Sequence, residues 1–161
     1  TEVVAETADE MIEQAKTYFP LGDAVTIKVP CTVEGLKACK ILSDQGIKVN
    51  VTLIFSVAQA LMAAKAGAAY CSPFVGRCND NSFSGVELVR AIANAYAVQN
   101  MPTEILAASL RDVHHVSRCY TYGASVVTMP PKIFWKMYDH VLTREGLDLF
   151  QKDWESANET V

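Results

Sequence analysis

The chain has 161 residues, of which 50% are apolar, and it carries a formal net charge of −4. This balance is typical of one ordinary globular domain, and Lys and Arg occur singly rather than in runs, which argues against nucleic acid or a membrane surface as a partner. The most apolar window, residues 51–70, is interrupted by Ser56, Gln59 and Lys65, so it reads as neither a membrane span nor a signal peptide, and we expect a cytoplasmic protein.

Short runs rich in β-branched residues alternate with segments of helical spacing along the chain. The predicted strands, in chain order, are residues 2–5, 25–29, 49–55, 69–75, 105–111 and 125–129. The predicted helices are residues 8–19, 33–45, 57–66, 86–99, 113–122, 132–142 and 146–156, and residues 77–85 read as a turn-rich surface loop. Strict alternation implies parallel strands joined by right-handed crossovers, in either a doubly wound sheet or a barrel. No glycine-rich dinucleotide fingerprint follows any of these strands, and we therefore favour the barrel.

The cysteines indicate reduced thiols. They number five, which is odd, and no pair has the spacing of a zinc knuckle. We therefore expect no disulfide and no structural metal, and interpret the cysteines as small apolar residues in or near the core.

A complete barrel needs eight βα units and about 200 to 250 residues, whereas the sequence predicts only six strands. We expect residues 1–161 to form a single α/β domain, a TIM (β/α)8 barrel with the first two βα units absent from this chain. Six parallel strands alone expose two unpaired edges, so the remainder is expected in the natural protein or from another chain. Because two helices follow the last predicted strand, the second of them, at about residues 146–156, is expected to be a docking helix.

Alternate side chains of a barrel strand face the interior, and polar residues near the carboxyl ends of the strands build the site. In strand 25–29, Lys28 shares the inward side with Thr26, and Pro30 ends the strand directly afterwards. The same alternation puts residues 50, 52 and 54 inside the strand 49–55, and residues 107, 109 and 111 inside the strand 105–111. The candidate site residues are Glu2, Lys28, Asn50, Thr52, Ser72, Ser109 and Arg111, with Phe74 on the side of Ser72 and Arg77 on the following loop.

Each of these residues has an ordinary explanation when taken alone, because strand-end lysines are usually solvated and strand hydroxyls usually bond the backbone. An inward lysine together with an acid and several hydroxyls is costly in desolvation unless the group serves chemistry. To attack a ketone, the Lys28 amine must be uncharged, and burial beside the positive charge of Arg77 or Arg111 favours that form. The two guanidinium groups also suit a phosphate, and Glu2 and Thr52 suit proton transfer through a water.

The segment IKVPCTVEGLKACKILSDQGIKVNVTLIFSVAQALMAAKAGAAYCSPFVGR, residues 27–77, resembles the centre of the short single-domain transaldolases and their fructose-6-phosphate aldolase relatives. The resemblance extends through ILAASLR to the C-terminal LTREGLDLFQKDW. It implies that Lys28 forms a Schiff base with the substrate and that Glu2 and Thr52 handle the water and the protons. It further implies contacts to a dihydroxyacetone unit from Asn50 and Ser72, and to the substrate phosphate from Arg77, Ser109 and Arg111. No metal and no organic cofactor is implied.

Within the family that the chain resembles, the aldolase branch carries a tyrosine where this chain has Phe74 and a glutamine where it has Glu2. The resemblance thus implies a transaldolase of the pentose phosphate pathway, which moves a dihydroxyacetone unit from a ketose phosphate to an aldose phosphate. The family's first two strands also supply an aspartate for carbon–carbon cleavage and an asparagine that helps to hold the Schiff base, and this chain has neither. The resemblance also implies a ring-shaped homo-oligomer whose subunits pack through the C-terminal helix, here residues 146–156.

Two alternatives stay open. A class I aldolase that acts on fructose 6-phosphate or on a keto acid without transfer shares the lysine chemistry. An inactive barrel fragment, retained as an oligomer subunit or a binding module, would explain the missing units without any reaction.

Overall fold

A five-stranded parallel sheet forms the centre of the structure, a computed structural model that describes residues 1–159. The strands are β1 (Ile27–Pro30), β2 (Val49–Ile54), β3 (Tyr70–Pro73), β4 (Glu104–Ala107) and β5 (Val126–Val127). They lie side by side in chain order, and each neighbouring pair is parallel. The parallel α/β organisation predicted from the alternation is confirmed, while the barrel's two further βα units and the single-domain assignment stay predictions.

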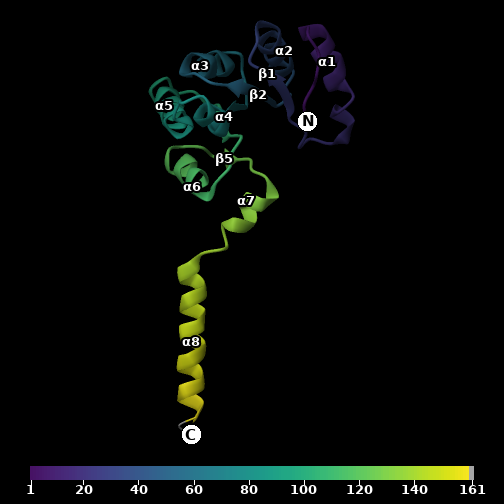
Figure 1. The fold of residues 1–161 in the computed structure, drawn as a ribbon. Coiled ribbons are helices and arrows are strands. Elements are labelled where there is room, and N and C mark those ends of the chain that lie inside the picture. The colour runs from purple at the N-terminus through teal and green to yellow at the C-terminus, as the bar shows by residue number, and fades with distance from the viewer. Residues whose placement is uncertain (160–161) are drawn as a thin grey trace.

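The helices that connect successive strands pack along the outside of the sheet, whereas one helix and a 3₁₀ turn precede the first strand and the last two helices follow the last strand (Figure 1). In chain order, the helices are α1 (Ala8–Lys16), the 3₁₀ turn η1 (Phe19–Leu21), α2 (Val33–Asp44), α3 (Val57–Lys65), α4 (Val75–Asp80), α5 (Gly85–Val98), α6 (Val113–Thr121), α7 (Pro131–Lys136) and α8 (Val141–Glu159). Five of them begin at a side chain that accepts a hydrogen bond from a backbone N–H of the first turn, namely Thr7, Thr32, Ser56, Ser84 and Asp112. Such caps satisfy N–H groups that have no partner within the helix, and they explain where these helices start.

The helix-facing side of the sheet is apolar and closed. Ile27 and Val29 of β1, Val49 and Val51 of β2, and Cys71 of β3 have no exposed surface. Their spacing of two residues puts them on one face of the sheet, and the residues between them on the other. The core therefore lies between the sheet and the helices, and leaves the opposite face for polar side chains.

All five cysteines are free thiols, and Cys39, Cys71, Cys78 and Cys119 are buried. Burial raises the pKa of Cys39, Cys71 and Cys119 to about 11. These three side chains therefore stay protonated at neutral pH and act as packing groups.

The predicted strand 2–5 is wrong. Glu2 forms a single isolated bridge with Lys28, and Val4 is 82% exposed. The backbone N–H and C=O of Val4 instead bond the side-chain amide of Gln14 on α1, at 2.8 Å and 2.9 Å. The Gln14 side chain thus bonds the N–H and C=O of Val4, which in a strand would bond a neighbouring strand.

The predicted surface loop 77–85 is also wrong in its first half, because α4 covers residues 75–80. Val75 and Cys78 on this short helix are buried, which holds it against the body. The helix ends before Ser82, whose φ of 63° lies in the left-handed region. The many polar residues of segment 77–85 suggested a loop, because the burial of Val75 and Cys78 cannot be recognised from the sequence.

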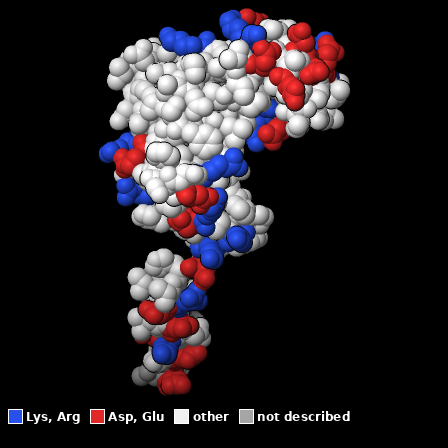
Figure 2. Space-filling view, turned by 45° about the horizontal axis from the view of Figure 1, so that its top comes forward, with Lys and Arg blue, Asp and Glu red and all other residues white. Residues whose placement is uncertain are grey.

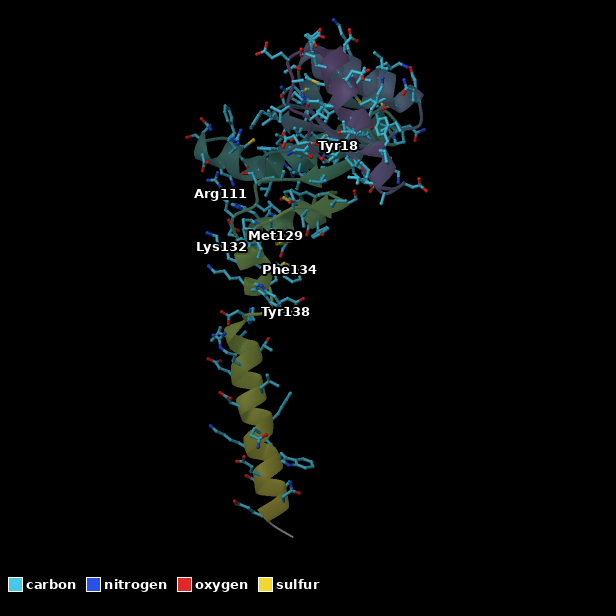
Figure 3. The ribbon with its side chains drawn as sticks, turned by 90° about the vertical axis from the view of Figure 1, so that its right-hand side faces the viewer. Tyr18, Arg111, Met129, Lys132, Phe134 and Tyr138 are labelled. Atoms are coloured by element: carbon cyan, nitrogen blue, oxygen red, sulfur yellow. The ribbon has the colours of Figure 1, made fainter. Side chains whose placement is uncertain are left out.

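The predicted helix 132–142 divides in two. α7 ends at Lys136, and residues 141 and 142 already belong to α8, where the backbone N–H of Leu142 bonds Nδ1 of His140 at 3.2 Å. Figure 3 labels Phe134 and Tyr138, which lie between the α/β body and α8.

α8 includes the predicted helix 146–156 and stands away from the α/β body (Figure 1), while the docking role of this helix stays a prediction. It has no buried residue within the described part of the chain. None of the helices in residues 1–159 is long and apolar enough to cross a membrane. The cytoplasmic location stays a prediction.

Candidate active site

Side chains on the sheet face opposite the core, the inner face, line a hollow of about 320 Å³. The side chains that line it include Thr26, Lys28, Asn50, Tyr70, Leu106 and Val126. The strand register holds them in a row, because Lys28 pairs with Asn50 across β1 and β2, and Asn50 pairs with Tyr70 across β2 and β3. Paired residues of parallel strands point to the same face, so one row of side chains crosses the sheet.

Lys28 reaches into this hollow beside a carboxylate. Its side chain is 32% exposed, and its Nζ donates a hydrogen bond to Oε2 of Glu2 at 3.2 Å. The isolated bridge between residues 2 and 28 brings the two side chains together. The amine is partly withdrawn from solvent and has an acid within reach of proton transfer. From the sequence we expected the positive charge of Arg77 or Arg111 beside this amine, whereas the ion-pair partner of Lys28 in the structure is Glu2.

Asn50, Thr52 and Ser72 form the polar floor of the same face. The hydroxyl of Ser72 donates to Oδ1 of Asn50 at 2.7 Å, and both side chains are buried. That bond engages the Asn50 carbonyl oxygen, whereas the NH2 group of the same side chain can donate to an acceptor of its own. Together with Glu2 and Lys28, these residues form the amine cluster.

The hydroxyl of Thr52 has no hydrogen-bond partner among the described residues, although Thr52 is only 1% exposed. A buried hydroxyl without a partner costs about 1–3 kcal/mol, and such a group is more often found where a ligand or an ordered water completes it. Directly after it, Leu53 has a φ of 59°, and the register of β2 against β3 shifts between Val51 and Ile54. This irregularity ends the regular alternation of β2 at the candidate site.

The structure brings the other predicted residues together beyond the ends of β3 and β4. The guanidinium carbon of Arg77 lies 4.9 Å from the centre of the Phe74 ring. The backbone N–H of Gly76 donates to the carbonyl oxygen of Ser109 at 3.0 Å, and Ser109 has a φ of 60°. Nη1 of Arg111 lies 2.5 Å from Oδ1 of Asp80. Gly76, Arg77, Asp80, Ser109 and Arg111 form the arginine cluster.

The two clusters lie at different levels of the sheet. Lys28 is the second of the four residues of β1 and is level with Asn50, the second residue of β2, and Tyr70, the first of β3. Arg77, in contrast, follows β3, and Arg111 follows β4. In parallel sheets the carboxyl ends of all strands lie at one edge, where sites are usually built. The arrangement offers a nucleophile with a neighbouring acid at one place and two guanidinium groups for an anion at another.

Two details of the predicted inward set are wrong. Leu106 lines the hollow, and Ala107 is fully buried in the core, so the alternation in β4 is shifted by one residue. Ser109 and Arg111 nevertheless lie near Gly76, because the left-handed Ser109 reverses the alternation. In β2, Ile54 is fully buried in the core. The ring of the next residue, Phe55, instead meets the Phe74 ring edge-on, with 5.9 Å between the ring centres.

Sequence reasoning missed several residues of the site, among them Val126 of β5, which lines the hollow. Tyr70 could have been found by its spacing of two residues from Ser72, since it lines the same face. For Leu106, Gly76 and Asp80 the local sequence carries no comparable signal. Leu106 depends on the shifted register of β4, and the other two depend on the packing of α4 against the residues after β4.

The family model described as Transaldolase/Fructose-6-phosphate aldolase matches residues 1–161. The chain belongs to this family. The resemblance drawn from the IKVP segment is thereby confirmed. Similar curated proteins are a probable transaldolase of Cereibacter sphaeroides, 48% identical, one of Paracoccus denitrificans, 47% identical, and one of Erythrobacter litoralis, 49% identical.

Each of these transaldolase-family relatives aligns over 160 residues, which cover 99% of this chain and 73%, 74% and 74% of the respective relative. The chain thus spans about three quarters of their length. Among solved structures, a mandelate oxidase aligns with a TM-score of 0.61 at 14% identity, over 80% of this chain and 48% of its own. At that identity the likeness concerns the fold alone.

Proposed function

We propose that this protein is a transaldolase in which Lys28 forms a Schiff base with a ketose phosphate and transfers a dihydroxyacetone unit to an aldose phosphate. The observation that supports it most is the Lys28 amine on the inner face of the sheet, 3.2 Å from the Glu2 carboxylate. Family membership and relatives named probable transaldolase favour the same reaction.

In this proposal, the lone pair of the Lys28 nitrogen attacks the ketone carbon and the resulting carbinolamine loses water to give the Schiff base. Glu2 and Thr52 handle the protons and the water of that step, consistent with the short distance from Glu2 to the amine and the unpartnered Thr52 hydroxyl. Cleavage of the C3–C4 bond then releases the remaining carbons as an aldose phosphate and leaves the three-carbon unit on Lys28. Addition of this unit to the acceptor aldehyde, followed by hydrolysis of the Schiff base, frees the lysine.

We further propose that Asn50 and Ser72 hold the hydroxyls of the bound three-carbon unit, since their hydrogen-bonded pair lies in the same row of side chains as Lys28. Arg77, Ser109 and Arg111 bind the phosphate, for which planar guanidinium groups are well suited. The aspartate for carbon–carbon cleavage is proposed to come from strands outside this chain that close the sheet into a (β/α)8 barrel of the pentose phosphate pathway enzyme. The chain-ordered parallel sheet is the arrangement expected of one wall of such a barrel.

Borohydride reduction tests the Schiff base directly. The protein is incubated with fructose 6-phosphate and borohydride and then weighed by mass spectrometry, with peptide mapping of the adduct. We expect one adduct on Lys28 that is absent from Lys28→Met. The matched control is Lys37→Met, since Lys37 is also paired with a glutamate, at 2.6 Å. An adduct that persists in Lys28→Met, or none in the unmodified protein, contradicts the proposal.

The products separate transfer from simple aldol cleavage. A transaldolase releases the three-carbon unit only onto an acceptor, whereas an aldolase releases free dihydroxyacetone. Phe74 favours transfer, because its ring contacts Phe55 and Arg77 and offers no hydroxyl at this place.

We also propose that α8 packs on another copy of the chain in a homo-oligomer. Leu147, Phe150 and Trp154 follow one another at helical spacing and are 62%, 69% and 68% exposed. Figure 2 shows charges of both signs along this helix with uncharged surface between them. An exposed apolar row of this length is typical of an interface between proteins.

Light scattering after size-exclusion chromatography tests the interface. We expect Phe150→Glu to lower the molar mass to that of a smaller assembly, while Lys152→Glu, on the opposite side of α8, leaves it unchanged. An equal mass for the unmodified protein and Phe150→Glu would refute a role of this row in assembly.

A further inference from the structure

One face of α4 contacts Arg111 at two points. Gly76 and Asp80 are four residues apart on this helix, so they lie on the same face, one turn from each other. Asp80 holds Nη1 of Arg111 at 2.5 Å. At the other point, Nε of Arg111 lies 3.0 Å from the position that a Cβ would take at Gly76. The side chain of Arg111 therefore runs along α4, with Nη1 bonded to Asp80 and Nε beside Gly76.

This arrangement leaves one edge of the guanidinium group available. A guanidinium group donates two parallel hydrogen bonds from either of two edges, one made by Nε and Nη2 and the other by the two Nη atoms. Asp80 occupies Nη1. The edge made by Nε and Nη2 remains. Nε of Arg111 and Oγ of Ser109 each lie 3.0 Å from the position of a Cβ built on Gly76, so the two groups are within about 6 Å of each other. One phosphate could therefore accept hydrogen bonds from this edge and from the Ser109 hydroxyl together.

We propose that Asp80 is a positioning residue of the phosphate site, which holds Arg111 so that its Nε–Nη2 edge faces the phosphate beside Ser109. The inference rests on the proposed function, since it assumes that Ser109 and Arg111 bind the substrate phosphate. Asp80 itself does not contact the substrate. It acts by keeping a long, flexible side chain in one orientation, which lowers the ordering cost when the phosphate binds.

The charge of Asp80 also repels a phosphate dianion. This repulsion weakens phosphate binding, whereas the orientation of Arg111 by Asp80 strengthens it. The side chains of Asp80 and Arg111 are 48% and 55% exposed, so solvent screens that repulsion. Screening reduces the hold of Asp80 on Arg111 less than this repulsion, because the two groups are in direct contact at 2.5 Å. Positioning is therefore the larger effect, and removal of Asp80 weakens phosphate binding.

The test compares a phosphorylated ketose with one that lacks phosphate. Borohydride trapping is measured at increasing concentrations of fructose 6-phosphate and, separately, of dihydroxyacetone, in the unmodified protein, Asp80→Ala and Asp80→Asn. The matched control is Asp44→Ala, because Asp44 is also exposed and lies 2.5 Å from a basic group, Nζ of Lys40, far from the site in sequence.

We expect Asp80→Ala to raise the half-saturating concentration of fructose 6-phosphate about 3- to 5-fold, the range of an exposed ion pair, with no change for dihydroxyacetone. Asp80→Asn, which keeps an oxygen acceptor, should lie between Asp80→Ala and the unmodified protein. Asp44→Ala should change neither. Inorganic phosphate, as a competitor of fructose 6-phosphate, should lose affinity in Asp80→Ala by the same factor.

Three results overturn the proposal. They are an unchanged fructose 6-phosphate requirement in Asp80→Ala, an equal loss for both ketones, and tighter binding in Asp80→Asn than in the unmodified protein, which would make Asp80 a charge competitor. If neither ketone is trapped in the unmodified protein, the proposed function itself fails. The two failures are therefore distinguishable.

Discussion

Gly76 is the position at which the smallest change should disturb the arginine cluster most. In Gly76→Ala the new methyl group would lie 2.1 Å from the carbonyl oxygen of Ser109, and 3.0 Å from Oγ of Ser109 and from Nε of Arg111. Ordinary van der Waals contact begins at 3.4 Å, and the closest of these atoms belongs to the backbone. Helix α4 and the segment after β4 must therefore move apart by more than about 1 Å, an overpacking that costs about 1–3 kcal/mol of unfolding free energy.

The displacement also stretches the hydrogen bond from the Gly76 N–H to Ser109, now 3.0 Å long. A shift of about 1 Å in groups that bind the reacting molecule can lower catalytic efficiency about 100-fold. We expect a loss of that order in kcat/KM with fructose 6-phosphate, and a much smaller loss in trapping of dihydroxyacetone, which has no phosphate.

Urea denaturation and steady-state kinetics measure the two effects. Gly146→Ala is the control, because nothing lies within 4 Å of a Cβ at that position in α8. It should stabilise the helix by at most about 1 kcal/mol and leave the kinetics unchanged. If Gly76→Ala keeps both its stability and its efficiency with fructose 6-phosphate, the close approach of α4 to Ser109 is not as described and the reasoning is refuted.

Three further predictions concern the scaffold. Tyr96→Phe should lower the unfolding free energy by about 1 kcal/mol in a denaturant titration, because the buried Tyr96 hydroxyl donates to the carbonyl of Ala60 at 2.7 Å; an unchanged midpoint would contradict it. Burial raises the pKa of Cys71 from 9.0 to about 11, so folding favours the protonated thiol. Its contribution of about 3 kcal/mol is complete below pH 9 and is lost as the pH rises towards 11. Cys71→Ala should therefore reduce the fall in stability over that interval, and an identical alkaline slope would count against the assignment. Asn100, which follows α5, has a φ of 50°, so Asn100→Ala should cost about 1 kcal/mol while Asn100→Gly should not, as thermal melting of both variants would reveal; equal losses would speak against left-handed strain at this position.

The sequence alone predicted those parts of the protein that depend on local rules. Helix starts at Thr32 and Asp112 could be anticipated, because an N-cap side chain needs only the backbone of the next turn. The alternation of Val25 to Val29 put Lys28 opposite the apolar side of its strand, and the structure places it on the inner face. Parallel strands followed from the order of strands and helices, since crossovers of this length leave no other arrangement.

The tertiary structure decided what depends on contacts between distant segments. Leu106 replaced Ala107 on the inner face because the pairing of β4 with its neighbours sets the register, and the left-handed Ser109 then redirected the chain. Gly76 and Asp80 became part of the arginine cluster only because α4 packs against the segment that carries Arg111. A spacing rule describes one segment at a time, whereas the position of a guanidinium group over a glycine is set by two segments more than thirty residues apart along the chain.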